Sequence, residues 1–184
     1  MEFSQLIFAR ESCRAFAEEA VPREDLLACV EAARQAPSAC NSQPWRFLLV
    51  DDTEKRAEIA DAVVERVSGM NRFAAKASAF IVVLEGKANM SASLGGKLKD
   101  QHYANLDVGG AMAYLTLAAA DRGIGTCILG WFDEKRIAAL LGVPASMRIR
   151  AVVAAGIPQK KEPRPKKRFD FTDICDVNAC GVKP

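Results

Sequence analysis

With 184 residues, the chain is long enough to bury a complete hydrophobic core and short for two, so we expect one domain over residues 1–184. Half of the residues are apolar and 26% are charged, which is ordinary for a globular protein. A formal net charge of +2 gives no reason to expect nucleic acid or an acidic membrane surface as a partner.

The first residues lack the basic-then-apolar pattern of a secretory signal, and no apolar stretch is long enough to cross a bilayer. We therefore expect a cytoplasmic protein that does not use a membrane. The six cysteines are scattered and no C-x-x-C pair occurs, which argues against zinc or iron–sulfur sites and for reduced thiols. The lone histidine, His102, has no second histidine with which to share a metal.

Apolar residues at helical spacing predict a series of helices. The predicted helices cover residues 2–9, 21–35, 53–68, 101–122 and 133–141. Gly69 is expected to end the third of these helices, and Gly142 the fifth. Apolar residues cover most of the circumference of the fourth, so we expect it to be central, and burial against a second subunit would explain its composition.

Short apolar runs predict strands at residues 45–50, 79–84, 125–130 and 148–157. The run at 79–84 does not alternate, which predicts a strand buried on both faces, and the run at 45–50 is also expected to be buried. Residues 86–100 contain three glycines and three lysines without a sustained period, so we expect an irregular, mobile segment there.

The segment from Arg10 to Phe16 keeps no helical period. If it is extended, Arg10, Ser12 and Arg14 project on one side and Glu11 and Cys13 on the other. Two cations flanking a hydroxyl would make an anion site. A solvated charged turn explains the segment equally well.

The loop from Ala36 to Trp45 is polar and bracketed by two prolines. Pro37 and Pro44 each restrict the backbone, while the hydroxyls and amides between them can both donate and accept hydrogen bonds. Such groups can recognise the edge of a flat, hydrogen-bonding ring. A simple turn between helix and strand remains the alternative.

Six of the nine residues from Lys160 to Arg168 are cationic. Alone, such a run is typical of a solvated tail or of one that contacts nucleic acid. The run contains no aromatic residue, and Glu162 and Asp170 interrupt or bound it, which weakens the nucleic-acid interpretation.

Several common catalytic motifs are absent from the sequence. Gly123-x-Gly125 follows a predicted helix and Ile128 stands where a dinucleotide fingerprint needs its third glycine. No G-x-x-x-x-G-K-[ST] loop occurs, and no G-x-S-x-G serine is present for His102 to serve. The remaining groups bind anions and present amides without an acid–base pair, which fits an enzyme whose chemistry is supplied by a cofactor.

Four motifs stand out in chain order. They are Arg10-x-Ser12-x-Arg14, Ala36-Pro37-Ser38-x-x-Asn41-x-Gln43-Pro44-Trp45, Gly123-Ile-Gly-Thr-Cys-Ile-Leu-Gly130-Trp-Phe and Pro165-Lys166-Lys167-Arg168. In this order they resemble the successive signatures of the FMN-dependent nitroreductase family, and the resemblance extends over nearly the whole chain. Glu11 departs from the family, in which a second basic residue is common. Because Glu11 projects on the alternate side, we expect little effect on phosphate binding.

The resemblance implies an α+β fold: a mixed, mostly antiparallel sheet flanked by helices, in an intertwined homodimer with two FMN sites at the subunit interface. It makes residues 1–184 a single nitroreductase-like domain. The C-terminal segment 158–184 would close the FMN site, the dimer, or both. The predicted helix 101–122 would then be the dimer core.

The resemblance also implies which residues bind the cofactor. The expected FMN-binding residues are Arg10, Ser12, Arg14, Pro37, Ser38, Ala39, Asn41, Asn71, Leu129, Gly130, Lys166 and Arg168. Of these, Arg10 and Arg168 would hold the phosphate, helped by Ser12 and Lys166, and Arg14 would face the pyrimidine side of the ring. The residues of the 36–45 loop would come from the other subunit, and the backbone at Leu129 and Gly130 would lie near flavin N5.

The implied function is an oxidoreductase that passes a hydride by a ping-pong mechanism from NAD(P)H, through FMN, to a nitroaromatic, quinone or related small acceptor. No side chain needs to act as acid or base, and no metal or nucleic acid is required. A different flavin-dependent reaction on the same fold, dehydrogenation or flavin cleavage, is one alternative. A basic module that binds nucleic acid is a more remote one.

Overall fold

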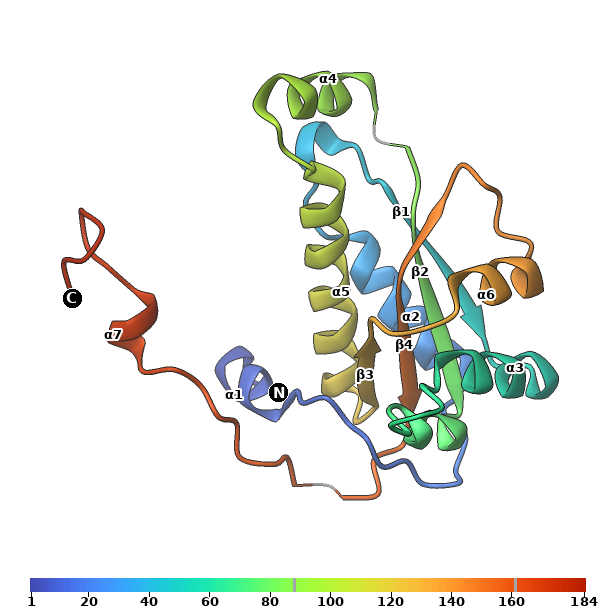
Figure 1. Ribbon diagram of the computed structural model, residues 1–184. Helices are drawn as coiled ribbons and strands as arrows, with labels where there is room; N and C mark the ends of the chain where they lie inside the picture. The colour runs from blue at the N-terminus through green and yellow to red at the C-terminus, as the bar shows by residue number, and fades with distance from the viewer. Residues whose placement is uncertain (88, 161) are drawn as a thin grey trace.

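The computed structural model describes residues 1–87, 89–160 and 162–184, so Ala88 and Lys161 lie outside the described residues. Its centre is a four-stranded sheet with the order β1-β2-β4-β3 (Figure 1). The strands are β1 (Trp45–Val50), β2 (Ala79–Glu85), β3 (Gly125–Leu129) and β4 (Arg148–Gly156). These strands agree with the predicted ones to within one residue at each end.

Neighbouring strands of the sheet all pair antiparallel. Ser12 adds one parallel pairing to the sheet, because it forms an isolated β-bridge with Thr126 of β3. The predicted α+β class with a mixed, mostly antiparallel sheet is therefore confirmed for the single chain.

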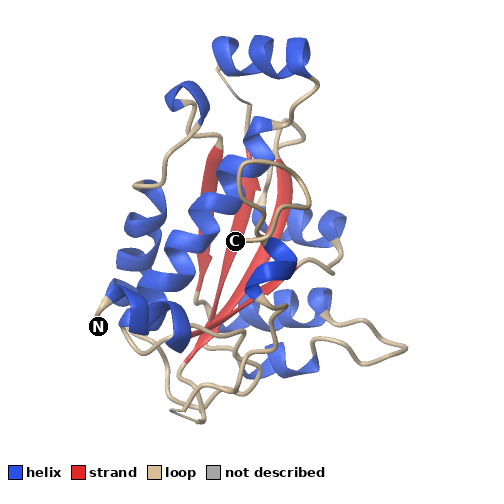
Figure 2. Cartoon of the chain, turned by 90° about the vertical axis from the view of Figure 1, so that its left-hand side faces the viewer, coloured by secondary structure: helices blue, strands red, loops and turns tan. Residues whose placement is uncertain are grey.

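Helices and short 3-10 turns surround the sheet. They are α1 (Phe3–Ala9), α2 (Arg23–Arg34), η1 (Ala39–Asn41), α3 (Thr53–Val63), η2 (Arg72–Lys76), α4 (Met90–Lys99), α5 (Tyr103–Asp121), α6 (Glu134–Leu141) and α7 (Phe171–Ile174). Helices α2 and α5 cover one face of the sheet (Figure 2), and α3 and α6 belong to the core on the other face. No helix of the described chain is both long and apolar enough to span a bilayer.

Strand β2 is buried on both faces, as its unbroken apolar run predicted. Phe80 and Val82 pack in the core under α3 and α6, whereas Ile81 and Val83 pack in the core under α2 and α5. Strand β1 was predicted to be buried as well, and this is wrong for most of its length. Because β1 lies at the sheet edge, Val50 is buried while the other residues are half-buried or exposed.

Helix α3 ends at Val63, five residues before the predicted end. The Glu65 carboxylate accepts hydrogen bonds from the backbone N–H groups of Val67 (2.9 Å) and Ser68 (2.5 Å), which closes a turn in place of a further helical turn. As a result Val67, expected to face the core, is 94% exposed. Gly69 lies in this turn with φ +71° and does not cap the helix.

The irregular segment predicted at residues 86–100 is also corrected by the structure, which places α4 there. The side chain of Asn89 accepts a hydrogen bond from Ala92 N–H at 2.9 Å and so caps the first turn. Met90, Leu94 and Leu98 recur at helical spacing, but all three are exposed. The two glycines of α4 masked this pattern in the sequence.

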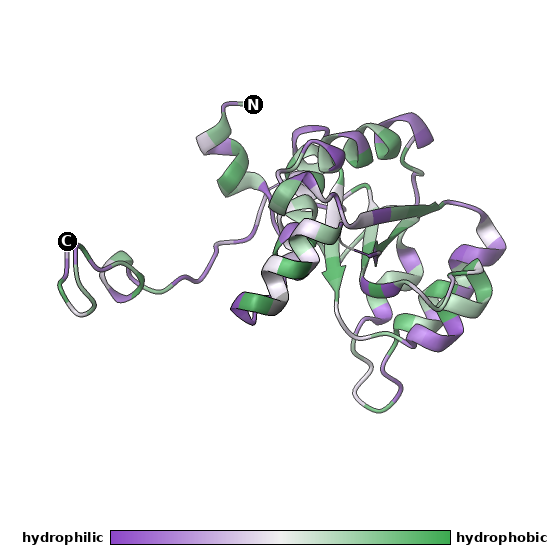
Figure 3. Ribbon diagram, turned by 90° about the horizontal axis from the view of Figure 1, so that it is seen from above, coloured by the Kyte–Doolittle hydropathy of each residue, from purple (hydrophilic) through white to green (hydrophobic). Residues whose placement is uncertain are grey.

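Helix α5 lies against the sheet as expected, with Val108 and Leu115 buried. Its other side keeps apolar residues in solvent: Leu106 is 65% and Tyr114 is 44% exposed. The chain beyond β4 leaves the body as an extended arm that ends beyond α7 (Figures 1 and 3). Phe169 on this arm is 79% exposed. One chain therefore leaves two apolar surfaces in water, on α5 and on the arm.

Candidate functional site

A cluster of cations lies where the arm passes the segment after α1. Arg10, Ser12, Lys166 and Arg168 line a cavity of about 280 Å³. An adjoining cavity of about 410 Å³ shares Arg10, Lys166 and Arg168. Four residues expected to bind one phosphate are thus brought together from positions more than 150 residues apart in sequence.

Local structure explains why the segment after α1 presents these groups. The backbone is extended at Arg10, and Cys13 N–H donates to the carbonyl of Thr126 in β3 at 2.8 Å. Cys13 is buried. The predicted alternation is incomplete, because Glu11 lines the same cavity as Arg10 and Ser12 and Arg14 lines a cavity with Glu11 and Cys13. Gly125 permits this close approach, because a Cβ there would lie 2.8 Å from the Cys13 sulfur.

The electrostatics of the cluster favour an anion. The ammonium of Lys166 donates to the carbonyl of Ile7 in the last turn of α1 at 2.6 Å. Burial lowers the pKa of Lys166, and the neighbouring charges of Arg10 and Arg168 lower it further. A dianionic phosphate would relieve this repulsion and could accept charge-assisted hydrogen bonds from all three side chains.

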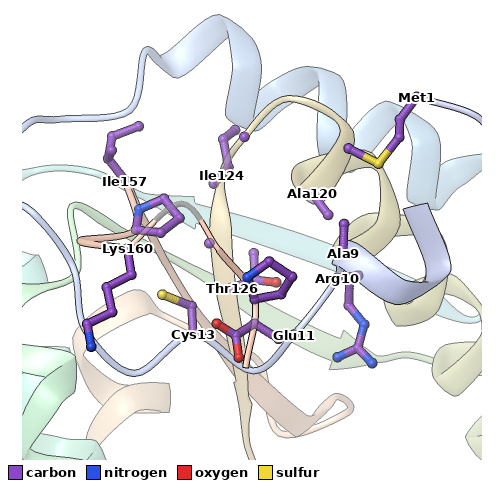
Figure 4. Close-up of a pocket in the computed structure, with 14 residues that line it drawn as sticks. Met1, Ala9, Arg10, Glu11, Cys13, Ala120, Ile124, Thr126, Ile157 and Lys160 are labelled. Atoms are coloured by element: carbon purple, nitrogen blue, oxygen red, sulfur yellow. The ribbon is translucent and has the colours of Figure 1, made fainter. Parts of the chain in front are cut away.

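Arg14 lies beside this cluster, in a different cavity. It lines a space of about 210 Å³ together with Cys13, Pro158 and Lys160. A larger cavity of about 380 Å³ lies under α1; Figure 4 shows Glu11 between Arg10 and Cys13 on its wall. The sequence predicted Arg10 and Arg14 on one side, and the structure places them in adjacent cavities.

Asn71 and Gly130 form a second part of the candidate site, at the far end of β3. Asn71 has a left-handed backbone (φ 67°), and its amide donates to the carbonyls of Val63 at 3.0 Å and Trp131 at 3.4 Å. The side chain of Leu129 is buried, so only its backbone can serve a ligand. Gly130 is exposed, and apart from Gly130 itself and its two neighbours in the chain, no heavy atom of the described residues lies within 4 Å of the position of a Cβ there.

The spacing along β3 suits an elongated ligand. Thr126 lies beside Ser12, and Gly130 follows four residues later, about 13 Å along a strand. An anion at the cation cluster and a flat ring near Gly130 could therefore belong to one molecule that extends along β3.

The loop before β1 is held away from this site. Its expected flavin-binding residues are Pro37, Ser38, Ala39 and Asn41. Cys40, Asn41 and Gln43 all have positive φ angles, of 51°, 51° and 46°, a strained conformation of the kind that collects at functional sites. The Ser38 hydroxyl accepts from Gln43 N–H at 3.0 Å and stabilises this turn.

Two residues that the sequence analysis missed hold the loop in place. Asp107 of α5 accepts from Ala39 N–H, with both oxygens at 3.2 Å. Asn89 donates from its backbone to the Ser42 hydroxyl at 2.8 Å and from its amide to the Cys40 carbonyl at 3.0 Å. Neither residue belongs to a recognisable motif, and only the packing of α4 and α5 reveals them.

Within one chain the loop and the cation cluster lie at opposite ends of α5 (Figure 1). The loop contacts Asp107 near the start of the helix, whereas the N-terminal amino group before α1 pairs with Asp121 at its end, at 3.0 Å. These two positions are about 21 Å apart along a helix. A single chain therefore does not bring all the predicted residues to one place.

Comparison with known proteins shows the family to which the chain belongs. Residues 7–157 match the model of the Nitroreductase family, and the chain belongs to that family of oxidoreductases. A protein of Archaeoglobus fulgidus, provisionally named an NADH dehydrogenase or NAD(P)H nitroreductase, is 31% identical over 88% of each chain. An iodotyrosine deiodinase of Thermotoga neapolitana is 27% identical, over 85% of this chain and 88% of its own.

The fold is also found among solved structures. An oxidoreductase containing FMN superposes with a TM-score of 0.77 at 27% identity, covering 97% of this chain and 92% of its own. The relatives thus include a flavoprotein, and their names include more than one reaction.

Proposed function

We propose that this protein binds FMN between two copies of the chain and reduces nitroaromatic, quinone or related small acceptors with NADH or NADPH. One observation carries this proposal. Arg10, Lys166 and Arg168 converge beside Ser12 at the start of β3, and the exposed Gly130 directly follows the end of that strand. Bound FMN would supply hydride transfer in a ping-pong reaction, from the nicotinamide to the acceptor.

The residues of the cluster would hold the phosphate. Arg10 and Arg168 provide guanidinium groups, which suit bidentate contact with phosphate oxygens, and Lys166 adds a point charge. The Ser12 hydroxyl would donate one further hydrogen bond. Arg14, in the adjacent cavity, would place a positive charge at the pyrimidine side of the ring, where it would stabilise negative charge.

At the other end of β3, this chain would supply backbone to the ring. The backbone at Leu129 and Gly130 would lie near flavin N5, and the missing side chain of Gly130 leaves space for a flat ring. Asn71 would present its amide beside Trp131, since that amide already points at the Trp131 carbonyl. None of these groups needs to accept or release a proton.

The second copy would supply Pro37, Ser38, Ala39 and Asn41. Two observations support this homodimer. The loop contacts Asp107 and the N-terminal amino group contacts Asp121, two positions about 21 Å apart along α5, and α5 exposes an apolar face that includes Leu106 and Tyr114. Two helices paired antiparallel along this face would bring each loop to the partner's cluster. Exposed apolar residues of the arm, such as Phe169, would be covered in the same assembly.

The absorbance spectrum tests this proposal directly. Purified protein, or protein mixed with FMN and passed through a desalting column, should retain the flavin bands. NADH or NADPH added without oxygen should bleach these bands, and a nitroaromatic or a quinone should restore them. Protein that retains no flavin would contradict the proposal.

A different flavin-dependent reaction on the same fold is the second candidate. The similarity to an iodotyrosine deiodinase favours it, since that relative covers 85% of the chain, against 88% for the nitroreductase-named one. Dehydrogenation or flavin cleavage belongs to the same alternative. Bound FMN that neither NADH nor NADPH reduces in a stopped-flow experiment would select this candidate.

A further inference from the structure

Glu11 places a negative charge beside the proposed phosphate site. Its carboxylate is 23% exposed and accepts a hydrogen bond from Arg164 Nε at 2.8 Å. The same guanidinium donates through Nη2 to the carbonyl of Ser12 at 2.6 Å. Arg164 therefore binds both the side chain of one residue of the segment and the backbone of the next.

This contact attaches the arm to the rest of the chain. Between Gln159 and Arg168, the described residues bond to the rest of the chain at three points: Gln159 N–H to the Ala15 carbonyl at 3.1 Å, Arg164 to the Glu11 and Ser12 pair, and Lys166 to the α1 carbonyl. Arg164 stands just before Lys166 and Arg168, which must reach the phosphate. Its contact therefore sets where those two cations lie.

We propose that the Glu11–Arg164 ion pair is a positioning device that holds Lys166 and Arg168 of the arm over the phosphate of FMN. This inference rests on the proposed function. It assigns a role to Glu11, which sequence reasoning expected to matter little, and to Arg164, which that reasoning did not select. Both residues line the cavity of the cation cluster. The proposal gives them a positioning role because the Arg164 guanidinium is already bonded to Glu11 and to the Ser12 carbonyl.

For the variant Glu11→Gln, charge repulsion alone and arm positioning predict opposite changes in FMN affinity, so this variant tests the inference. A carboxylate beside an anion site repels the anion, so Glu11→Gln should tighten FMN binding if charge alone matters. If Glu11 positions the arm, the same change releases Arg164 and the cations that follow it, and FMN binding weakens. The two explanations therefore differ in sign.

The test measures dissociation constants for FMN and for riboflavin, which lacks the phosphate, by flavin fluorescence at fixed ionic strength. Glu11→Gln and Arg164→Gln should each weaken FMN binding about threefold to tenfold, since an ion pair with this second hydrogen bond exceeds an ordinary surface pair. Riboflavin binding should not change. The charge-reversed double variant Glu11→Arg with Arg164→Glu should recover part of the FMN affinity, because it restores the ion pair but not the hydrogen bond to the Ser12 carbonyl.

Glu162→Gln is the matched control, because it also removes one carboxylate charge, from the arm two residues before Arg164, and should leave FMN affinity within about twofold. Equal or tighter FMN binding by Glu11→Gln overturns the inference, as does an equal loss of FMN and riboflavin affinity. Wild-type protein that binds no FMN refutes the proposed function, and the inference with it.

Discussion

The carboxylate of Asp107 accepts a hydrogen bond from the backbone N–H of Ala39, with both oxygens at 3.2 Å. This contact joins the strained loop before β1 to the long helix α5. It matters because in the proposed dimer the loop would meet the partner's cofactor in a defined position. The helix that forms the proposed dimer core therefore also fixes the loop that would serve the partner's flavin.

Asp107→Asn should weaken FMN binding without destroying the fold. Asn keeps an acceptor but loses the charge, so the contact to Ala39 N–H should lose about 0.5 to 1.5 kcal/mol, or about twofold to tenfold in FMN affinity. Fluorescence titration measures the affinity and thermal unfolding checks the fold. Asp121→Asn, on the same helix, is the control and should bind FMN normally. Unchanged affinity in Asp107→Asn would show that this contact does not fix the loop.

Arg10→Ala and Arg168→Ala should each weaken FMN binding by about 1.5 to 3 kcal/mol, because each removes charge-assisted hydrogen bonds to the phosphate. That loss corresponds to about a tenfold to 150-fold increase in the dissociation constant. Arg66→Ala, at an exposed arginine near the end of α3, should have little effect. Normal flavin retention by both Arg10→Ala and Arg168→Ala would place the phosphate elsewhere.

Lys166 should make the protein without FMN less stable at neutral pH. Burial, Arg10 and Arg168 lower its pKa from 10.5, so the unfolded chain binds more protons between the lowered pKa and 10.5. The free energy of unfolding therefore rises with pH across that window. Lys166→Met should remove this rise and stabilise the flavin-free protein at neutral pH, while weakening FMN binding.

Urea unfolding at several pH values, with and without FMN, measures both effects. The exposed neighbour Lys167→Met is the control and should keep the wild-type pH dependence. If Lys166→Met kept the wild-type pH dependence, the cation crowding inferred for this cluster would be wrong.

Leu106→Asp should disrupt the dimer and flavin binding together. Leu106 is exposed on the apolar face of α5 in the single chain, so a charge there would be buried only at the proposed interface. Sedimentation velocity should show a monomer and a desalting column should show lost FMN. Val67→Asp, at an exposed residue beyond α3, should remain dimeric and yellow. A dimeric, flavin-bound Leu106→Asp would move the interface off this face.

Thiol reactivity should report on the loop before β1. Burial raises the pKa of Cys29 to about 11 and also raises the pKa of Cys13 and Cys127, so iodoacetamide at pH 8 should leave these three thiols unmodified. Cys40 and Cys180 are exposed and should react. FMN should slow modification of Cys40 but not of Cys180, as measured by peptide mass spectrometry. Equal protection of both thiols would argue against flavin at the loop.

Much of the fold was predictable because local pattern and burial agree. The unbroken run in β2 predicted a central strand, and β2 is central. The apolar circumference of α5 also predicted a central element, but in the single chain α5 is buried on one side only. Helix α4 was missed because two glycines interrupt a pattern whose apolar residues then face solvent. The early end of α3 was missed because it depends on one side-chain cap, Glu65, rather than on a breaking residue.

The candidate site was predictable only where a motif carried it. The four residues of the cation cluster were named from the sequence and converge in the structure. The contacts that hold the site together, Glu11 with Arg164 and Asp107 with Ala39, join segments 153 and 68 residues apart. No local pattern encodes such pairs, because they depend on the path of the arm and on the packing of α5.

An anaerobic FMN titration of the 184-residue protein, followed by nicotinamide addition, tests the central claim most directly. We expect saturation at one FMN per chain, and sedimentation should show a dimer that carries two FMN molecules. NADH or NADPH should then bleach the bound flavin. We also expect Arg168→Ala to weaken FMN binding but not riboflavin binding. Wild-type protein that binds no flavin, or binds riboflavin as tightly as FMN, would contradict the account.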